Sequence, residues 1–244
     1  MGADRVVVSD LEIVFVDLDV SCAVLEAEEA HTPRLGASDV VRAASLDDDR
    51  RQQQLWRGAR IALRIVLERM AGPEIRGVDF GIATGGRPAL GAGLPHFSLS
   101  HTGAVALIAV SRLGSLGVDI EKMRQLSMNA ARRDRIVAAA AALAPDVSFN
   151  PDNDADVLRA WVGLEAVAKA RGSGIGVLLT EAGVIGNGAA QAGNYRALAI
   201  AALDVPEPYV AAVAAPELPQ TISVQTFPSR ADGLDTFLAR PVGQ

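Results

Sequence analysis

Apolar residues gather in short blocks along the chain, and their spacing changes from one block to the next. Residues 11–18, LEIVFVDL, are rich in β-branched and aromatic side chains, which is typical of a buried strand. Between residues 55 and 67 apolar side chains recur three and four positions apart with arginines between them. This spacing predicts a helix of about four to six turns. Gly72 and Pro73 follow it, a pair that commonly ends a helix.

The middle of the chain predicts a hairpin followed by helices. VALIAVS reads as a strand, RLGS as a turn and LGVDIE as a second strand, so we expect a hairpin over residues 105–121. Residues 122–171 then have a helical pattern, with an alanine-rich run that Pro145 stops. The strongest helix signal covers residues 156–171.

The last third repeats the same order of elements. Two apolar runs, YRALAIAAL and YVAAVAA, are joined by the turn-forming segment DVPEP. Strand, helix and hairpin therefore occur twice, which predicts an α+β protein with two related halves, residues 1–116 and 117–216. The proline-rich and polar residues 217–244 are expected to form a peripheral tail.

Composition narrows the class of protein. A chain of 244 residues that is 50% hydrophobic and 21% charged suits one large domain or two closely packed smaller ones. A net charge of -6 argues against a nucleic-acid-binding protein, because such proteins carry a basic excess. The single cysteine, Cys22, excludes an internal disulfide and favours a reducing compartment, so we expect a cytoplasmic protein. We expect no membrane association, since the sequence has neither a membrane-length apolar run nor a signal-like start.

A pair of acids stands at the end of the apolar segment GVDIE. Asp119 and Glu121 are two positions apart, so both side chains of a strand point to the same face. Two carboxylates there repel each other unless the strand end is solvated or a hard divalent cation lies between them. The spacing alone favours the solvated strand end.

A second set of residues follows one face of the helix predicted at 156–171. Trp161, Glu165 and Lys169 are spaced four apart. One interpretation is an ordinary solvent-facing Glu/Lys pair; the other is a third carboxylate that completes a magnesium site with Asp119 and Glu121. The chain has only two lysines, at 122 and 169, and uses arginine for its other basic side chains, so each lysine hints at a specific requirement.

Ser100 and His101, in FSLSHT, are a weaker candidate pair. A hydrolase dyad is disfavoured because adjacent residues on an extended chain point to opposite sides. The sequence also has no G-x-S-x-G elbow around Ser100, no Walker A motif and no dinucleotide-binding glycine fingerprint. A hydrogen-bonded surface role for His101 is the plain alternative.

Four short motifs in order resemble the signature of the 4′-phosphopantetheinyl transferases, in their two-fold duplicated, single-chain (Sfp-like) form. They are GRP at 86–88, FSLSHT at 97–102, GVDIE at 117–121 and WVGLEAVAKARGSG at 161–174. The family pattern is approximately GKP, F-N-x-S-H-S, G-V/I-D-x-E and W-x-x-K-E-A/S-x-x-K-x-x-G-x-G. The likeness covers about residues 45–215. It implies two pseudo-symmetric α+β halves with the active site between them.

The resemblance also implies an activity. Enzymes of this family move 4′-phosphopantetheine from coenzyme A to a serine of an apo acyl or peptidyl carrier protein and release 3′,5′-ADP. The reaction depends on Mg²⁺. The implied partners are therefore coenzyme A and a carrier protein of fatty acid, polyketide or nonribosomal peptide synthesis, and we expect a monomer because a duplicated chain builds the cleft by itself.

Site residues carry over motif by motif. The resemblance assigns the metal ligands to Asp119, Glu121 and Glu165. It assigns coenzyme A contacts to Arg87, Ser100, His101 and Lys169. We add Arg57 for the 3′-phosphate, chosen among the three arginines at 57, 60 and 64. The catalytic residues are then Glu165, as the general base for the serine hydroxyl, and Lys169, on the diphosphate.

Two positions depart from the family pattern. Ser98 replaces the usual asparagine, and Leu164 replaces the first lysine of the K-E motif. The missing lysine implies weaker binding of coenzyme A and predicts that Leu164→Lys raises transfer. It also leaves open a catalytically weakened homologue that acts as a coenzyme A or carrier-protein binding module. A metal-free α+β scaffold would require the order of the four motifs to be coincidence.

Overall fold

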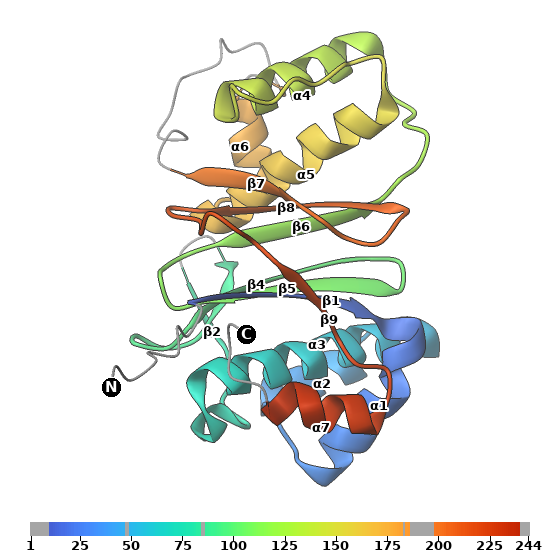
Figure 1. Cartoon of the computed structure of the whole chain (residues 1–244), viewed down its shortest axis with the longest axis vertical. Helices are drawn as coiled ribbons and strands as arrows, with labels where there is room; N and C mark the ends of the chain where they lie inside the picture. The colour runs from blue at the N-terminus through green and yellow to red at the C-terminus, as the bar shows by residue number, and fades with distance from the viewer. Residues whose placement is uncertain (1–9, 47–48, 84–85, 183, 186–197, 240–244) are drawn as a thin grey trace, which may run out of the picture.

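The computed structural model describes residues 10–46, 49–83, 86–182, 184–185 and 198–239. The fold is α+β, as predicted, and has four layers (Figure 1). Two sheets face each other in the middle, helices α1, α2, α3 and α7 cover the outer face of one, and helices α4, α5 and α6 cover the other. Each layer of helices is therefore separated from the other by both sheets.

The two large sheets repeat one strand order. The first contains β4 (His96–Thr102), β5 (Val105–Ser111), β1 (Leu11–Asp17) and β9 (Val224–Thr226), in that order. The second contains β7 (Ala199–Leu203), β8 (Tyr209–Ala215) and β6 (Gly117–Lys122). In the first sheet β5 lies between its hairpin partner β4 and the earlier strand β1; in the second, β8 lies between its hairpin partner β7 and the earlier strand β6. All four pairs are antiparallel.

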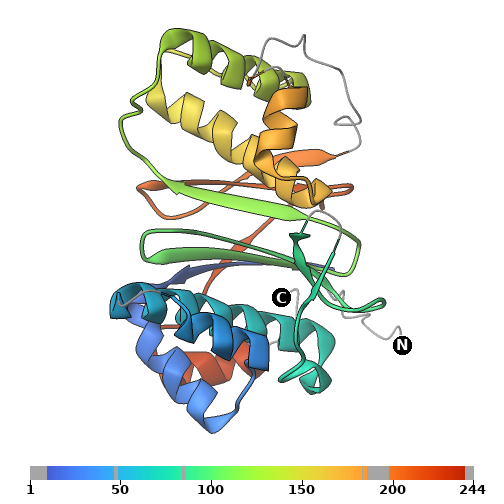
Figure 2. The same ribbon diagram turned by 180° about the vertical axis from the view of Figure 1, so that it is seen from behind.

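Helices fill the connections between the first strand and the hairpin of each half. The first half contains α1 (Leu18–His31), α2 (Ala37–Ala44), α3 (Arg50–Ala71) and the short 3₁₀ turn η1 (Pro73–Ile75). The second half contains α4 (Ala130–Leu143), α5 (Asp154–Arg171) and α6 (Ile175–Glu181). A small hairpin of β2 (Gly81–Ile82) and β3 (Pro88–Ala89) runs beside the two sheets (Figure 2).

Both faces of the sheets are buried, which explains the unbroken apolar runs in the sequence. On β1, Val14 and Val16 pack toward the helices of the first half, whereas Ile13 and Phe15 pack between the sheets. Alternate residues of a strand point to opposite faces, so a strand between two layers is apolar at nearly every position. Strand β8, with YVAAVAA, follows the same rule.

The hairpin predicted over residues 105–121 is wrong. Strand β5 pairs with β4, through a two-residue connection in which Gly103 has φ +56, and β6 belongs to the other sheet. A tight turn with positive φ favours glycine, and Gly103 provides it between β4 and β5. The hairpin therefore forms at this two-residue connection and not at RLGS. The RLGS segment instead carries the chain from the first sheet to the second.

The peripheral tail expected at 217–244 is corrected as well. Strand β9 adds to the first sheet in parallel with β1, and helix α7 (Ala231–Ala239) follows it. Phe227 and Phe237 are buried in the core of the first half, with ring centroids 5.2 Å apart. These residues complete the first half although they come last in the chain.

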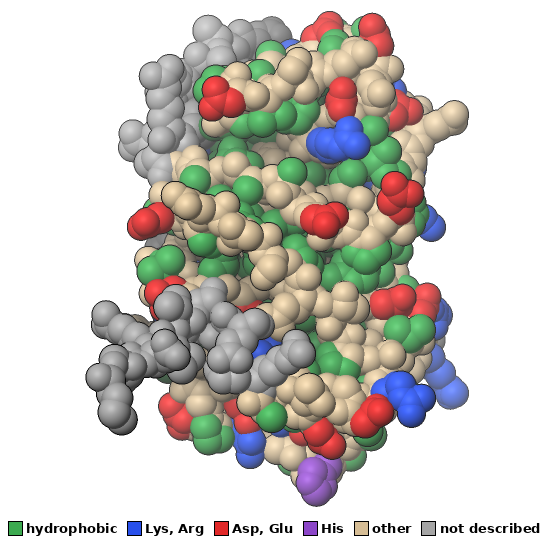
Figure 3. Space-filling model, viewed as in Figure 1, with side chains coloured by type: hydrophobic (Ala, Val, Ile, Leu, Met, Phe, Trp, Pro, Cys, Tyr) green, Lys and Arg blue, Asp and Glu red, His purple; other side chains and the backbone are tan. Residues whose placement is uncertain are grey.

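No helix in the described part of the chain combines the length and apolar character that a membrane crossing needs. On the face drawn in Figure 3, acidic and basic side chains are interspersed over the helical layers.

A buried ion pair joins the first sheet to the helices outside it. Glu12 of β1 bonds Arg69 of α3, and both side chains are at most 3% exposed. The Arg69 guanidinium lies 3.9 Å from the centroid of the Phe237 ring. Burial raises the pKa of Glu12 to about 7, and the positive charge of Arg69 only partly opposes this.

Stability should therefore fall as pH rises through the range between the unfolded and folded pKa values of Glu12. Below about pH 4.5 the carboxyl is protonated in both states, and between about pH 4.5 and 7 the folded state holds the proton more tightly. We expect the free energy of unfolding to fall by about 2 kcal/mol between about pH 5 and pH 8 because of this group. Urea unfolding of the wild type and of Glu12→Gln at both pH values measures it. Parallel pH profiles of the two proteins would contradict the assignment.

Candidate functional site

Two edge strands, one from each sheet, meet side by side and align their polar residues. Ser100 of β4 donates a hydrogen bond to Asp119 of β6, with 2.7 Å between Oγ and Oδ1. One step along, Thr102 donates to Glu121, with 3.3 Å between Oγ1 and Oε2. Side chains two positions apart on a strand point the same way, so Asp119 and Glu121 on β6 face the two hydroxyls of Ser100 and Thr102 on β4. The result is a polar seam between the halves.

Lys169 of α5 enters this seam. Its Nζ lies 2.9 Å from Oγ of Ser100 and 2.8 Å from Oδ1 of Asp119. The Asp119 side chain is only 8% exposed, whereas that of Lys169 is 29% exposed. Buried carboxylates need a compensating charge, and the Lys169 ammonium supplies it here.

A glycine allows α5 to approach β6 closely enough for this contact. A Cβ atom on Gly117 would lie 2.0 Å from the carbonyl oxygen of Ala166 and 2.8 Å from Cβ of Lys169. Only glycine fits there without displacing the helix. Nη1 of Arg87 donates to the carbonyl oxygens of Leu116, at 3.2 Å, and Lys169, at 2.9 Å, so the β2–β3 hairpin is tied to the same junction.

Glu165 lies one turn before Lys169 on α5 and faces the same cluster. Burial raises the pKa of Glu165, the carboxylate of Asp119 raises it further, and Lys169 opposes both effects. Glu121 adds a smaller upward push. The three acids predicted as metal ligands thus interact electrostatically, and Glu165 is a better proton acceptor than an ordinary surface carboxylate.

Glu121 is the most open of the three acids. Arg124 pairs with it at 2.7 Å, and the Glu121 side chain is 24% exposed. In the residues that the structure describes, no three acidic, histidine or cysteine side chains already lie close enough together to hold a metal ion. The predicted ligands therefore do not form a ready-made metal site in this structure; Lys169 pairs with Asp119, and Arg124 pairs with Glu121.

The donor set nevertheless fits a hard divalent ion. Every side-chain donor at the seam apart from the cations is an oxygen, from three carboxylates and two hydroxyls, which suits Mg²⁺ rather than zinc or copper. The Lys169 ammonium already stands against Asp119 as the positive charge that this acid requires. Mg²⁺ characteristically takes only part of its shell from protein and the remainder from water and phosphate.

A pocket of about 310 Å³ opens beside the seam. It is lined by Trp56 and Arg60 of α3, by Arg87, by His101 of β4 and by Lys169. The Arg60 guanidinium carbon lies 5.0 Å from the centroid of the Trp56 ring. Burial lowers the pKa values of Arg60 and Arg87, a sign that both charges are held with little water around them. We call this the cationic pocket, because three basic side chains, Arg60, Arg87 and Lys169, line it. Arg60 also pairs with Asp39, with 3.3 Å between Nε and Oδ1.

A second pocket, of about 210 Å³, shares Trp56 and His101 with the cationic pocket. Its remaining walls include the aliphatic side chains of Leu18, Leu46 and Leu55. The two pockets are therefore adjacent: the first is lined by three basic side chains and the second mainly by aliphatic ones.

Arg57, which we selected from the sequence for the 3′-phosphate, lies elsewhere. Its Nε donates to Glu26 of α1, at 2.8 and 3.0 Å from the two carboxylate oxygens, and it is not among the residues that line the cationic pocket. Arg60, nearly one helical turn further on, lines that pocket instead. At 3.6 residues per turn the two side chains lie only about 60° apart around the helix axis, so spacing in the sequence alone could not decide which of them faces the pocket.

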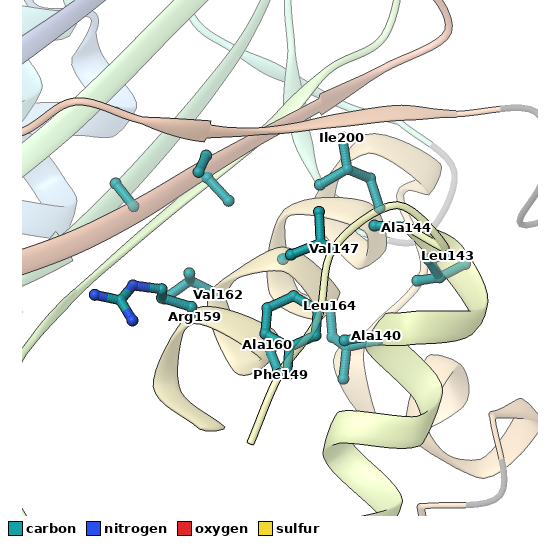
Figure 4. A pocket seen from close by; sticks show the side chains of 14 residues that line it. Ala140, Leu143, Ala144, Val147, Phe149, Arg159, Ala160, Val162, Leu164 and Ile200 are labelled. Atoms are coloured by element: carbon teal, nitrogen blue, oxygen red, sulfur yellow. The ribbon is translucent and has the colours of Figure 1, made fainter. Parts of the chain in front are cut away.

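Leu164 also lies away from the seam, contrary to what the motif comparison implies. Its side chain is 0% exposed and belongs to the core between α4, α5 and the second sheet. There it lines an apolar pocket of about 100 Å³ together with Phe149, Val162 and Ile200 (Figure 4). The difference between lysine and leucine at this position therefore concerns packing in this structure.

Sequence reasoning missed two members of the site. Thr102 pairs with Glu121, and its position two residues after Ser100 is a signal that could have found it. Trp56 lies on the helix that was predicted, but its side-chain direction depends on how α3 packs against β4. Nothing in the local sequence of α3 indicates that contact.

No family model matches the chain, and no curated protein matches it.

Proposed function

We propose that this protein is a 4′-phosphopantetheinyl transferase, which moves phosphopantetheine from coenzyme A to a serine of an apo acyl or peptidyl carrier protein. One observation carries the proposal. Four motifs that are separated by up to about 80 residues in the sequence meet at a single junction, where Arg87, Ser100, Asp119 and Lys169 are linked by hydrogen bonds. A coincidence of motifs would have no reason to converge in space.

The topology supports the same proposal. Each half consists of a strand, helices and a hairpin, and the order β4-β5-β1 in the first sheet corresponds to β7-β8-β6 in the second, with β9 added to the first. A pseudo-symmetric pair of halves with its site at their junction is what the family resemblance implies. Here β4 contributes from the first half and β6 and α5 from the second.

Coenzyme A matches the two pockets in polarity. Its nucleotide and diphosphate carry the negative charge that Arg60, Arg87 and Lys169 would balance, and phosphate binding by such cations is worth more where water is excluded. Its pantetheine arm is long and weakly polar, which suits the aliphatic walls of the neighbouring pocket. His101 lines both pockets.

The chemistry follows from the positions of the charges. The oxygen of the carrier serine forms a bond to the β-phosphorus of coenzyme A, the bond from that phosphorus to the bridging oxygen breaks, and 3′,5′-ADP leaves. Glu165 accepts the serine proton, directly or through a water molecule. Lys169 balances charge that develops on the diphosphate oxygens.

Asp119, Glu121 and Glu165 would hold Mg²⁺, with phosphate oxygens and water completing its shell. When bound, the ion neutralises negative charge on the diphosphate. The protein's own part is to hold Asp119 through Ser100 and Lys169, and Glu121 through Thr102 and Arg124, on the side of the seam that Glu165 also faces.

A non-catalytic module that only binds coenzyme A or a carrier protein is the second candidate. Its main support in the sequence is Leu164. Since that side chain is packed in the core of the second half, the substitution removes no group from the seam in this structure. The retained acids favour the enzyme.

Release of 3′,5′-ADP tests the proposed function. The protein is incubated with coenzyme A, Mg²⁺ and a panel of apo carrier proteins, each paired with a variant in which the modified serine is alanine. We expect 3′,5′-ADP to form with at least one carrier and not with its alanine variant. Binding of coenzyme A without release on any carrier would favour the binding module.

The two arginines of α3 make a matched pair for coenzyme A binding. Arg60→Ala should weaken binding by about tenfold or more, because it removes a charge that lines the cationic pocket. Arg57→Ala should leave binding within about twofold of the wild type, because Arg57 pairs with Glu26 on the surface. Calorimetric titration with coenzyme A measures both. Equal losses in the two variants would contradict the placement of the ligand.

A further inference from the structure

We propose that the polar seam binds a divalent ion only together with a diphosphate. Lys169 occupies the position of the ion beside Asp119 until a diphosphate attracts the lysine away. This inference rests on the proposed function and adds an order of binding to it. Lys169 is the residue that makes the site reject the free ion and accept the ion bound to a diphosphate.

The contact at Asp119 carries the inference. Oδ1 of Asp119 receives hydrogen bonds from both Ser100 and Lys169, at 2.7 and 2.8 Å. A free metal ion that used this oxygen would stand next to the ammonium, and two cations a few ångströms apart in a poorly hydrated site repel strongly. The free ion must therefore displace Lys169, bind without Asp119, or use the other carboxylate oxygen, Oδ2, while still facing the charge of the ammonium.

The rest of the seam gives the free ion little compensation. Glu121 is already paired with Arg124 at 2.7 Å, and Asp119 with Lys169 at 2.8 Å. Before any ligand binds, the Lys169 and Arg124 side chains thus already neutralise two of the three acids. A metal ion alone would gain a single carboxylate that is not hydrogen-bonded to a cation.

A diphosphate changes this balance. Lys169 lines the cationic pocket as well as the seam, and its side chain is 29% exposed, so its ammonium has a second position to occupy. The phosphate oxygens would attract it from the pocket side, where Arg60 and Arg87 also favour an anion. Asp119 is then released for the ion, whose remaining positions the same phosphate oxygens can fill.

Binding of Mn²⁺, a spectroscopic substitute for Mg²⁺, tests the inference without a transfer assay. The amount of Mn²⁺ retained with the protein on ultrafiltration is measured by electron paramagnetic resonance, with and without coenzyme A. The chain offers a matched control, because its other lysine, Lys122, follows Glu121 directly and makes no hydrogen bond to Asp119 among the described contacts. The variants are Lys169→Met, Lys169→Gln, Lys169→Arg and Lys122→Met.

Wild type should retain Mn²⁺ at least about tenfold more tightly with coenzyme A than without it. Lys169→Met without coenzyme A should bind Mn²⁺ at least about tenfold more tightly than wild type does, whereas Lys122→Met should resemble wild type. Lys169→Gln can still hydrogen-bond Ser100 and Asp119 but carries no charge, so it should bind Mn²⁺ as tightly as Lys169→Met does. Agreement between the two variants separates the loss of charge from a disturbance of the fold in either one. Lys169→Arg should keep the weak binding of wild type.

Equal Mn²⁺ affinity in wild type, Lys169→Met and Lys169→Gln would overturn the inference, even if the protein transfers phosphopantetheine. Tighter Mn²⁺ binding by both uncharged variants supports the inference. If the two uncharged variants bind Mn²⁺ more tightly but the wild type modifies no carrier in the transfer assay, the proposed function fails while the role of Lys169 at the seam stands. The two failures are therefore distinguishable.

Discussion

Asp119→Asn is expected to lower phosphopantetheine transfer by at least about a thousandfold, the largest effect at the seam. Asparagine keeps the shape of the side chain and can still accept hydrogen bonds from Ser100 and Lys169. It loses the negative charge that holds Lys169 and would hold Mg²⁺. Transfer is measured as kcat/KM for coenzyme A with a carrier that the wild type modifies.

Folding should survive this change. Asparagine relieves repulsion with Glu165, so we expect the free energy of unfolding to stay within about 1 kcal/mol of the wild type. Asp232→Asn, at an exposed ion pair with Arg230 on the far side of the first half, is the control for loss of one carboxylate. Transfer by Asp119→Asn at the level of Asp232→Asn would refute the site.

Leu164→Lys should destabilise the protein by about 3 kcal/mol or more and should not improve transfer. The structure therefore reverses what the motif comparison implies for this position. Leu164 is 0% exposed among apolar side chains of α4, α5 and the second sheet, and an ammonium there loses its hydration without gaining a partner. Urea unfolding measures the loss.

Leu164→Met is the matched control. It conserves volume and polarity, so it should cost less than about 1.5 kcal/mol. A Leu164→Lys protein that is as stable as Leu164→Met and transfers faster than the wild type would show that the side chain reaches the seam, and that the packing in Figure 4 is not the one that operates in solution.

Local signals in the sequence predict much of the fold. The helix over 55–67 ends at Gly72, whose φ of 104 is natural for glycine, and α5 ends at Gly172 in a left-handed conformation. The hairpin of β7 and β8 lies where two apolar runs flank DVPEP. Each of these features depends on a few adjacent residues, so the sequence contains them directly.

Elements that depend on distant partners are harder to predict. The pattern does not indicate α1, because acidic and apolar residues alternate along Leu18–His31 without a clear apolar face. Strand β6 was expected beside β5, yet it pairs with β8, about 90 residues later in the chain. Apolar strands that are buried on both faces carry no mark of which neighbour they choose.

The site divides in the same way. Strand alternation correctly predicts that Asp119 and Glu121 share a face, and helical spacing correctly places Glu165 and Lys169 one turn apart. The contact between Lys169 and Asp119 crosses 50 positions of sequence and depends on Gly117 admitting α5. The choice of Arg57 over Arg60 fails for a similar reason, since the packing of α3 decides which arginine lines the pocket.

Intact mass of an apo carrier protein tests the central claim most directly. Carriers of fatty acid, polyketide and nonribosomal peptide type are incubated with coenzyme A, Mg²⁺ and either the wild type or Asp119→Asn. The proposed function predicts that at least one carrier gains the mass of a single phosphopantetheine with the wild type and stays unmodified with Asp119→Asn. Every carrier remaining unmodified by a folded wild type that binds coenzyme A, or equal modification by both proteins, would contradict it.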